Sequence, residues 1–244
     1  LPLLPLVEKL KESEDSVESH RGKPRAIILV PIKELASQVF GEAKKITHHA
    51  KLRVRVALGG DKAKSLKGEY VDVLIGGPGR IKSMLEKGEI SLEKLEYFLI
   101  DEADQMMDMG FMPQIKSILE VIPVKRQNFL FSATMPTKVI RLTEDFLEYP
   151  EKVEVTPEVV TVEAIEQKLY RVPNFKTKIN LLESLLDDAE LSRVIVFVET
   201  KSNADSVGKY LERKGLGAGR IIHANKGQNS RINSVNEFKD GDVR

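Results

Sequence analysis

The stretch Tyr97-Phe98-Leu99-Ile100-Asp101-Glu102-Ala103-Asp104 decides the fold of this chain. Its first four residues are apolar and β-prone, and the acids that follow mark the polar end of a buried strand. In open α/β sheets, ligands bind outside the carboxyl ends of the strands. An acid at such a strand end can hold a magnesium ion, usually through its waters, and a second acid can accept a proton from an attacking water. The stretch therefore predicts an α/β fold with a polar site at residues 101–104.

A second strand-end motif strengthens this prediction. The apolar run Asn128–Phe131 ends in Ser132-Ala133-Thr134. A simpler interpretation exists for each motif taken alone. Either acid of the first motif can cap the next helix, where a carboxylate meets the positive helix end, and the Ser-Ala-Thr segment can form a turn or an N-cap before Pro136.

Composition limits the class of protein. The 38 Lys and Arg residues nearly balance the 37 Asp and Glu residues, so the formal net charge is only +1. No global basic excess indicates nucleic acid, and any such contact has to come from local placement. The 244 residues contain no cysteine, which excludes disulfides and thiolate metal sites within this sequence and suits an intracellular protein. No apolar run reaches membrane-spanning length and residues 1–10 lack the pattern of a signal peptide, so we expect no membrane partner.

Strand patterns alternate with helical patterns along the chain, and the continuous apolar runs favour parallel sheets covered on both faces. In the first part we expect strands at Ala26–Val30, Val54–Leu58, Val71–Ile75, Tyr97–Ile100, Asn128–Ser132 and Lys152–Val155. In the second part we expect strands at Gln167–Val172, Arg193–Val198 and Arg220–Ala224. The expected helices between them are Glu34–His48, Gly79–Lys87, Met112–Val121, Lys138–Leu147, Lys176–Asp187, Asn203–Lys214 and Gln228–Phe238.

The texture of the sequence changes between Pro150 and Ala164, where two prolines and several valines predict an extended segment. We therefore predict two α/β lobes, 1–157 and 166–244, joined by a linker at 158–165. The stretch Lys11–Arg25 mixes charges of both signs with Gly22 and Pro24, and it predicts a solvated surface loop.

The order of the motifs resembles that of DEAD-box ATP-dependent RNA helicases of superfamily 2. The matching motifs are Pro31–Ala36, Gly59-Gly60, Gly77–Arg80, Asp101–Asp104, Ser132–Thr134, Val194–Thr200, and Gln228 with Arg231. The resemblance covers essentially the whole chain. It implies two RecA-like lobes, ATP and Mg²⁺ as cofactors, RNA as partner, and ATP hydrolysis coupled to RNA duplex unwinding or to remodelling of ribonucleoprotein.

The resemblance assigns roles to the two strand-end motifs. Asp101 would approach Mg²⁺, through water, and Glu102 would orient or deprotonate the hydrolytic water. Asp104 would bond to Ser132 and Thr134, and this link would couple nucleotide chemistry to movement between the lobes.

Three strand-end loops of the first lobe would form one RNA surface, with contacts to the backbone and little base specificity. Helix N-termini and cations suit phosphates, and glycines let a backbone approach a sugar-phosphate chain. The residues concerned are Pro31, Lys33, Glu34, Gly59, Gly60, Pro78, Gly79 and Arg80. The alternatives are a helix start at Pro31, glycine turns, and an ion pair of Arg80 with Glu86 or another surface acid.

In the second lobe the resemblance implies phosphate contacts from Thr200, Gln228 and Arg231. A solvated helix face is the alternative interpretation for these residues. The resemblance implies a monomer acting on RNA in the cytoplasm, the nucleus or an organelle.

Departures from the family pattern suggest a divergent member, of an organellar or ribosome-assembly type. Ile32 and Lys33 replace a threonine and an arginine, Gly77 replaces a threonine, and His223-Ala224-Asn225 replaces His-Gly-Asp. Lysine keeps the charge but loses the fork geometry of arginine.

The sequence contains no Gly-x-x-x-x-Gly-Lys-Thr phosphate loop, so the resemblance covers the middle of a helicase core. We expect the first lobe to lack the phosphate-loop strand and the second to lack its C-terminal strands. Alone, this chain is then expected to be inactive. Two alternatives remain: a non-catalytic RNA clamp or assembly factor on the same fold, and a translocating helicase that acts on DNA.

Overall fold

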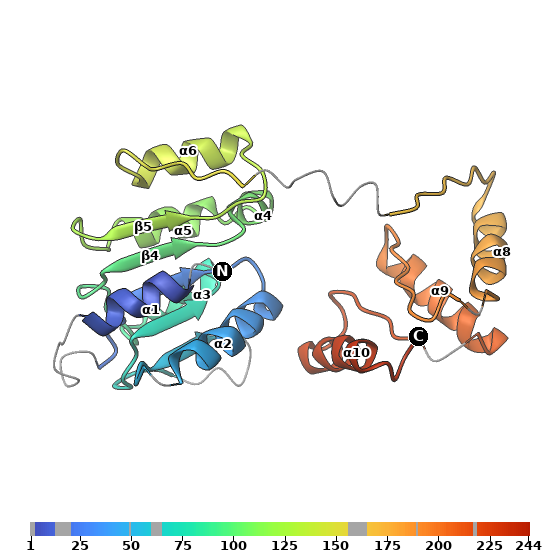
Figure 1. The fold of residues 1–244 in the computed structure, drawn as a ribbon, viewed down its shortest axis with the longest axis horizontal. Helices are drawn as coiled ribbons and strands as arrows, with labels where there is room; N and C mark the ends of the chain where they lie inside the picture. The colour runs from blue at the N-terminus through green and yellow to red at the C-terminus, as the bar shows by residue number, and fades with distance from the viewer. Residues whose placement is uncertain are drawn as a thin grey trace. The chain divides into compact units, whose positions relative to one another are not determined.

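The computed structural model describes residues 3–12, 21–48, 50–59, 65–155, 165–188, 190–216 and 219–244. The chain divides into two compact units, residues 1–153 and 154–244 (Figure 1). Most of the predicted linker, residues 158–164, lies outside the described residues. No helix among the described residues is both long enough and apolar enough to cross a membrane.

The first unit contains a five-stranded parallel sheet, as the continuous apolar runs predict. Its strands are β1 (Ala26–Leu29), β2 (Val54–Ala57), β3 (Val73–Gly76), β4 (Tyr97–Ile100) and β5 (Gln127–Leu130). They lie in the order β2-β3-β1-β4-β5, and each pairs in parallel with its neighbour. Because the carboxyl ends of parallel strands share one edge of the sheet, the segments that follow β4 and β5 emerge side by side.

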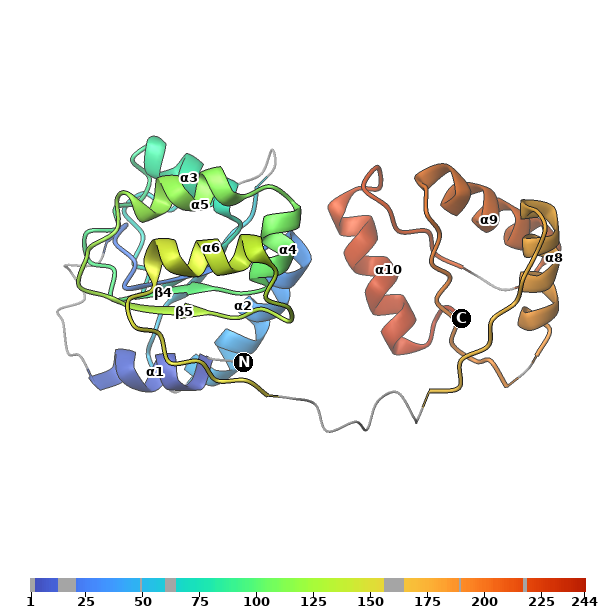
Figure 2. The same cartoon turned by 90° about the horizontal axis from the view of Figure 1, so that it is seen from above.

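Helices cover both faces of the sheet (Figure 2). On one face α1 (Leu3–Glu12) and α2 (Lys33–Thr47) pack against Ile28, Ile75 and Leu99. On the other face Ile27, Leu74 and Phe98 meet the remaining helices of the unit. These helices are α3 (Pro78–Glu86), α4 (Ala103–Asp108), α5 (Met112–Leu119) and α6 (Thr137–Phe146). Burial on both faces explains why the three central strands, β3, β1 and β4, are continuously apolar.

The two ends of the segment Lys11–Arg25 differ from the predicted surface loop, and residues 13–20 lie outside the described residues. Lys11 belongs to α1, and the Arg25 side chain is only 4% exposed. The Arg25 guanidinium donates to both carboxylate oxygens of Glu96, at 2.7 and 3.3 Å, and to the Leu10 carbonyl at 3.1 Å. The mixed charges of the segment therefore include one member of a half-buried ion pair, Arg25 with Glu96. This pair connects the end of α1 and the start of β1 to the segment before β4.

We expect Glu96→Gln to lower the free energy of unfolding of the first unit by about 2 kcal/mol, because the buried Arg25 guanidinium loses its charged partner. Urea unfolding followed by circular dichroism measures the change. Glu42→Gln is the matched control, since Glu42 pairs with a Lys45 side chain that is 72% exposed. That change should shift stability by less than about 0.5 kcal/mol. Equal shifts for the two variants would contradict the expectation.

The second unit contains α8 (Phe175–Leu186), α9 (Lys201–Lys214) and α10 (Gln228–Asp240), close to the predicted helices. No strand is assigned among the described residues of this unit, so the strands predicted at Gln167–Val172, Arg193–Val198 and Arg220–Ala224 are wrong. The strand predicted at Lys152–Val155 is wrong too.

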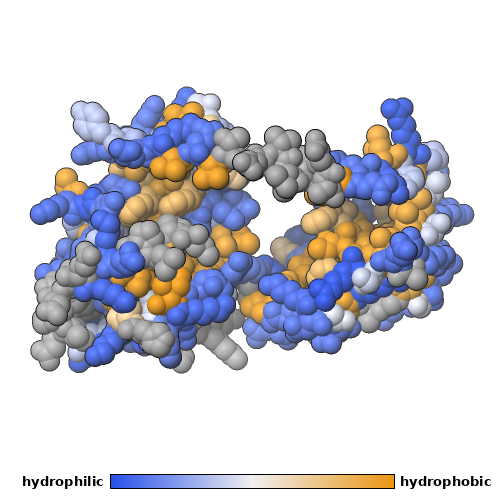
Figure 3. All heavy atoms as spheres, viewed as in Figure 1, coloured by the Kyte–Doolittle hydropathy of each residue, from blue (hydrophilic) through white to orange (hydrophobic). Residues whose placement is uncertain are grey.

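Apolar runs predict these segments as strands, but a strand also requires a hydrogen-bonded neighbour. The described segments lack such a ladder, and their apolar side chains stay at the surface (Figure 3). Ile195 is 62% exposed and Phe197 is 89% exposed. A cavity of 740 Å³ is lined by residues of two of these segments, 194–198 and 220–223, together with α9.

Candidate functional site

The ends of β4 and β5 are joined by backbone hydrogen bonds. The N–H of Asp101 donates to the Leu29 carbonyl at 3.0 Å, which continues the ladder between β1 and β4. The N–H of Phe131 donates to the Ile100 carbonyl at 2.8 Å, and the N–H of Ala103 donates to the Phe131 carbonyl at 3.0 Å. The acidic quartet and the Ser132–Thr134 segment are therefore held against each other at the carboxyl edge of the sheet.

Glu102 has a strained backbone. Its φ of 53° and ψ of 51° lie in the left-handed region, where a residue other than glycine costs on the order of 1–2 kcal/mol. The conformation turns the chain sharply from β4 into α4. Its N–H donates to the Asp101 carboxylate at 3.0 Å, and its carbonyl accepts from the Met106 N–H at 3.0 Å. Strain of this kind persists where the surrounding structure holds it, and it is common at active sites.

Two of the acids have raised pKa values. Burial raises the pKa of the Asp101 carboxyl, and the hydrogen bond from the Glu102 N–H only partly offsets this effect. Burial also raises the pKa of the Glu102 carboxyl, and the negative charges of Asp101 and Asp104 raise it further. Two neighbouring carboxyl groups with raised pKa values are typical of a site that transfers protons.

Asp104 is bonded to the Ser-Ala-Thr segment, as the resemblance implies. Its carboxylate accepts from the Thr134 hydroxyl at 2.7 Å and from the Thr134 N–H at 3.0 Å. Its own N–H donates to the Ser132 hydroxyl at 3.1 Å, and that hydroxyl donates to the Thr134 carbonyl at 2.7 Å. Burial alone would raise the pKa of the Asp104 carboxyl, but hydrogen bonds, foremost from Thr134, outweigh it and lower the pKa.

The donor set at this edge fits a magnesium ion held mainly by its other ligands. No group of three or more Asp, Glu, His or Cys side chains that could hold a metal occurs among the described residues. Mg²⁺ commonly uses one or two carboxylates together with waters and substrate phosphates. Asp101 offers one half-buried carboxylate, of which one oxygen accepts the Glu102 N–H.

The three predicted RNA loops of the first unit meet in one pocket of 620 Å³ at the same edge of the sheet. Five of the predicted residues line it, namely Pro31, Lys33, Gly59, Gly79 and Arg80. A Cβ placed on Gly59 would lie 3.9 Å from the Lys33 Cε, so these two loops adjoin. Glu34 lies in the first turn of α2 and Pro78 begins α3, but neither lines the pocket, and Gly60 lies outside the described residues.

The helices that open at this pocket have no side-chain caps. The cap residues of α2 and α3 are Ile32 and Gly77, and neither makes a side-chain hydrogen bond. The positive ends of two helix dipoles suit an anion here.

Arg80 is paired, but not with Glu86 and not with an exposed acid. Its Nη2 donates to Glu89 at 3.4 Å, and the two side chains are 15% and 14% exposed. Glu86 pairs instead with Lys82, one turn earlier on α3. Sequence reasoning missed Glu89 and Lys87, which both line the pocket, because the spacing of residues on one helix says nothing of a loop that turns back on it.

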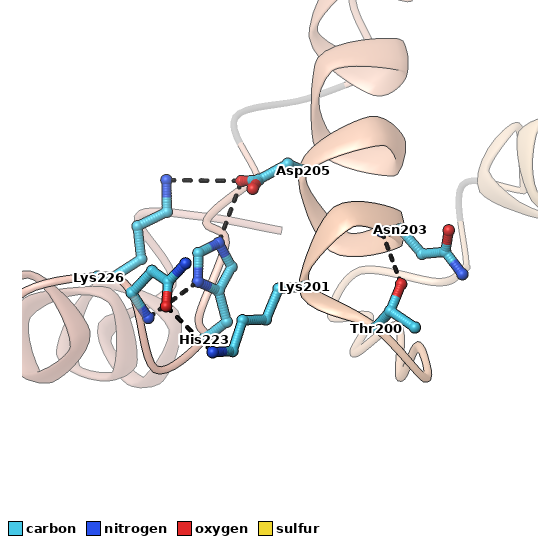
Figure 4. A network of polar contacts seen from close by, with 7 residues as sticks. Thr200, Lys201, Asn203, Asp205, His223 and Lys226 are labelled. Carbon is cyan, nitrogen blue, oxygen red and sulfur yellow. Dashed lines mark hydrogen bonds and ion pairs between the residues drawn. The ribbon is translucent and has the colours of Figure 1, made fainter.

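In the second unit, polar contacts gather at the start of α9 and in the segment before α10 (Figure 4). Thr200 is the N-cap of α9, and its hydroxyl oxygen accepts from the Asn203 N–H at 3.1 Å. Lys201 donates to Asn225 at 3.1 Å, which links the first turn of α9 to the segment before α10. Sequence reasoning missed Lys201.

His223 and Asp205 hold the same segment against α9. The ring Nε2 of His223 lies 3.1 Å from an Asp205 carboxylate oxygen, and Lys226 reaches the same carboxylate at 3.7 Å. Arg231 lies in the first turns of α10 and is partly buried, and α10 begins at Gln228, whose side chain is outside the described part. The structure thus brings two of the predicted second-lobe elements together at adjoining helix starts.

A parallel sheet covered by helices on both faces, with an acidic quartet at its carboxyl edge, is typical of the nucleotide-binding unit of RecA-like helicases. Residues 2–142 match the family profile "DEAD/DEAH box helicase", and residues 177–244 match "Helicase conserved C-terminal domain". The chain belongs to the DEAD/DEAH box helicase family.

Relatives agree with this assignment. The chain is 34% identical over 247 residues to the ATP-dependent RNA helicase RhlB of Pseudomonas putida, covering 99% of this chain and 62% of the relative. It is 36% identical over 263 residues to the DEAD-box ATP-dependent RNA helicase 52A of Oryza sativa subsp. japonica, covering 98% of this chain and 43% of the relative. The chain thus spans less than two thirds of the length of these curated relatives.

Solved structures share the fold. S. cerevisiae Dbp5 bound to RNA and ADP BeF3 matches with a TM-score of 0.83 at 24% identity, over 100% of this chain and 61% of that one. A DEAD box protein from the hyperthermophile Methanococcus jannaschii matches with a TM-score of 0.56 at 29% identity, over 100% of this chain and 63% of that one.

Proposed function

We propose that the full-length protein hydrolyses ATP and uses the hydrolysis to separate short RNA duplexes or to remodel ribonucleoprotein. One observation carries the proposal: Asp104, beside the acids suited to nucleotide chemistry, is hydrogen-bonded to Thr134 at the end of the next strand. The named relatives are ATP-dependent RNA helicases, and one solved structure of the same fold holds RNA and ADP BeF3.

In this proposal the two carboxyls with raised pKa values have separate roles in hydrolysis. Asp101 would hold the magnesium ion of the nucleotide through water, and that ion would neutralise phosphate charge. Glu102 would accept the proton of the attacking water, for which a base needs a pKa closer to the working pH than that of a free carboxylate. Burial and the two neighbouring acids move the pKa of Glu102 in this direction.

In the first unit RNA would bind over the pocket, and in the second unit the helix starts would offer phosphate contacts of their own. Lys33 and the N–H groups at the starts of α2 and α3 would meet phosphates, while Gly59 and Gly79 would permit close approach of the strand. From the second unit, Thr200 keeps its hydroxyl proton for a phosphate while its oxygen caps α9, and Gln228 and Arg231 would act from α10. Such contacts position a strand without reading its bases.

RNA-stimulated release of phosphate from ATP by the full-length protein tests the proposal. We expect single-stranded RNA to raise the turnover at least tenfold, and single-stranded DNA of matched sequence to raise it much less. Turnover that RNA does not stimulate would sink the proposal in favour of a non-catalytic RNA clamp. Equal stimulation by DNA would favour a helicase that acts on DNA.

A further inference from the structure

The pocket of the first unit contains a carboxylate, which has the same sign of charge as the anion that the pocket would bind. Among the described residues lining it, Lys33, Arg80 and Lys87 are cations and Glu89 is the single acid. An RNA surface binds mainly through cations that replace the counterions of the phosphates, and a fixed carboxylate works against this exchange.

Glu89 is held in a fixed position in the wall of the pocket. Its side chain is only 14% exposed, and its N–H donates to the Met84 carbonyl of α3 at 2.9 Å. The preceding Gly88 has a φ of +62°, a left-handed conformation that turns the chain back after α3 ends. The carboxylate therefore has a fixed place beside the Arg80 guanidinium, unlike the exposed Glu86 on the helix itself.

The pairing of Arg80 is incomplete. One contact of 3.4 Å joins Nη2 to Glu89, and the buried Nε of Arg80 has no hydrogen-bond partner among the described residues. A buried donor without an acceptor is costly. The single contact with Glu89 leaves the other guanidinium N–H groups of Arg80 for a phosphate, while the charge of Arg80 is already offset by Glu89.

We propose that Glu89 sets the affinity of this surface for RNA, as an internal counter-charge that offsets Arg80 and weakens phosphate binding in the pocket. The inference rests on the proposed function, because it takes the bound anion to be an RNA backbone. Looser binding at this loop lets a strand leave after each cycle, since weakened interface contacts change the dissociation rate more than the association rate.

Equilibrium binding of a fluorescent oligouridylate to the full-length protein tests this inference over a range of salt concentrations. Glu89→Gln should tighten binding about 5-fold at 0.1 M salt, because each additional effective cation changes log K by about 0.7 per decade of salt for a single strand. The slope of log K against log salt should steepen by about 0.7, so that the difference disappears near 1 M salt.

Glu86→Gln is the matched control. It makes the same change of charge three residues earlier, at the end of α3, but the 61% exposed Glu86 pairs with Lys82 and does not line the pocket. It should change binding less than 2-fold. Adding Arg80→Gln to Glu89→Gln should remove the gain, because the freed cation is then absent. Glu89→Ala is measured in parallel, and thermal unfolding of every variant checks that it folds.

The possible outcomes distinguish a failure of this inference from a failure of the proposed function. A wild-type protein that does not bind the oligouridylate would refute the proposed function. A wild-type protein that binds RNA, with Glu89→Gln and Glu89→Ala variants that bind equally or more weakly, would overturn the inference alone. That result would make Glu89 a residue that orients Arg80 toward the phosphate.

Discussion

The Glu102→Gln variant of the full-length protein is expected to hydrolyse ATP about 10²–10⁴-fold more slowly than the wild type, because glutamine cannot accept the proton of the attacking water. The amide has nearly the same shape, so the left-handed turn into α4 and the hydrogen bond from the Glu102 N–H to Asp101 are retained. RNA binding should change little, since Glu102 does not line the RNA pocket. A phosphate-release assay with saturating RNA measures turnover, and fluorescence anisotropy measures RNA binding.

The pH dependence of turnover gives a second readout. The pKa of Glu102 lies above its ordinary value of 4.5, because of burial and then the charges of Asp101 and Asp104. A base has to be ionised, so turnover should fall as the pH decreases through this raised pKa, and the acid limb should lie above pH 4.5. The limb belongs to the coupled pair Asp101 and Glu102, since Asp101 is shifted in the same direction.

The same shift has the opposite sign for stability. A raised carboxyl pKa in the folded state means that the folded protein binds the proton more tightly than the unfolded chain. Stability should therefore rise as the pH falls through this pKa, while activity is lost.

For the turnover of the Glu102→Gln variant, Glu144→Gln is the matched control, because Glu144 is an exposed glutamate of α6. Wild-type turnover in the Glu102→Gln variant, or an unchanged acid limb in its residual activity, would contradict the assignment of the base.

The sheet of the first unit could be predicted because its three central strands are short continuous apolar runs between polar strand ends. Tyr97–Ile100 and the run that contains Phe129 are strands in the structure, and they are neighbours in the sheet. The left-handed backbone of Glu102 could not be predicted, because no local pattern demands a positive φ at a glutamate. It follows from the chain turning from β4 into α4 while the Ala103 N–H stays bonded to Phe131.

The errors have a common physical source, which is that long-range partners are invisible in a local pattern. Arg25 was expected in a solvated loop, but Glu96 lies 71 residues away in sequence and pairs with it. The run Arg193–Val198 has the composition of a strand, yet a strand forms only when another strand bonds to it. For Arg80 the alternative to RNA binding was an ion pair with Glu86 or another surface acid, and the partner in the structure is Glu89, which reaches Arg80 from the loop after the helix.

The Asp104→Ala variant is expected to hydrolyse ATP within about 3-fold of the wild type and to separate RNA duplexes about 100-fold more slowly, since small displacements away from the chemistry can cost 10²-fold. Alanine removes the acceptor of the Thr134 hydroxyl and N–H, which join the segment after β5 to the start of α4. Hydrolysis would then proceed without the link that we propose transmits it. Release of a labelled strand from a short duplex, measured beside phosphate release, gives the ratio of the two rates.

Substitutions at Thr134 separate loss of this link from a general loss of folding. Thr134→Val keeps the shape and the N–H but removes the hydroxyl donor at 2.7 Å from Asp104, so it should show part of the uncoupling. Thr134→Ser keeps the hydroxyl and should behave as the wild type. Since the hydrogen bonds lower the pKa of Asp104, its carboxylate stays ionised well below neutral pH. The ratio of unwinding to hydrolysis should therefore stay constant where hydrolysis itself falls on the acid limb, and a ratio that falls together with turnover would place Asp104 among the groups that perform hydrolysis.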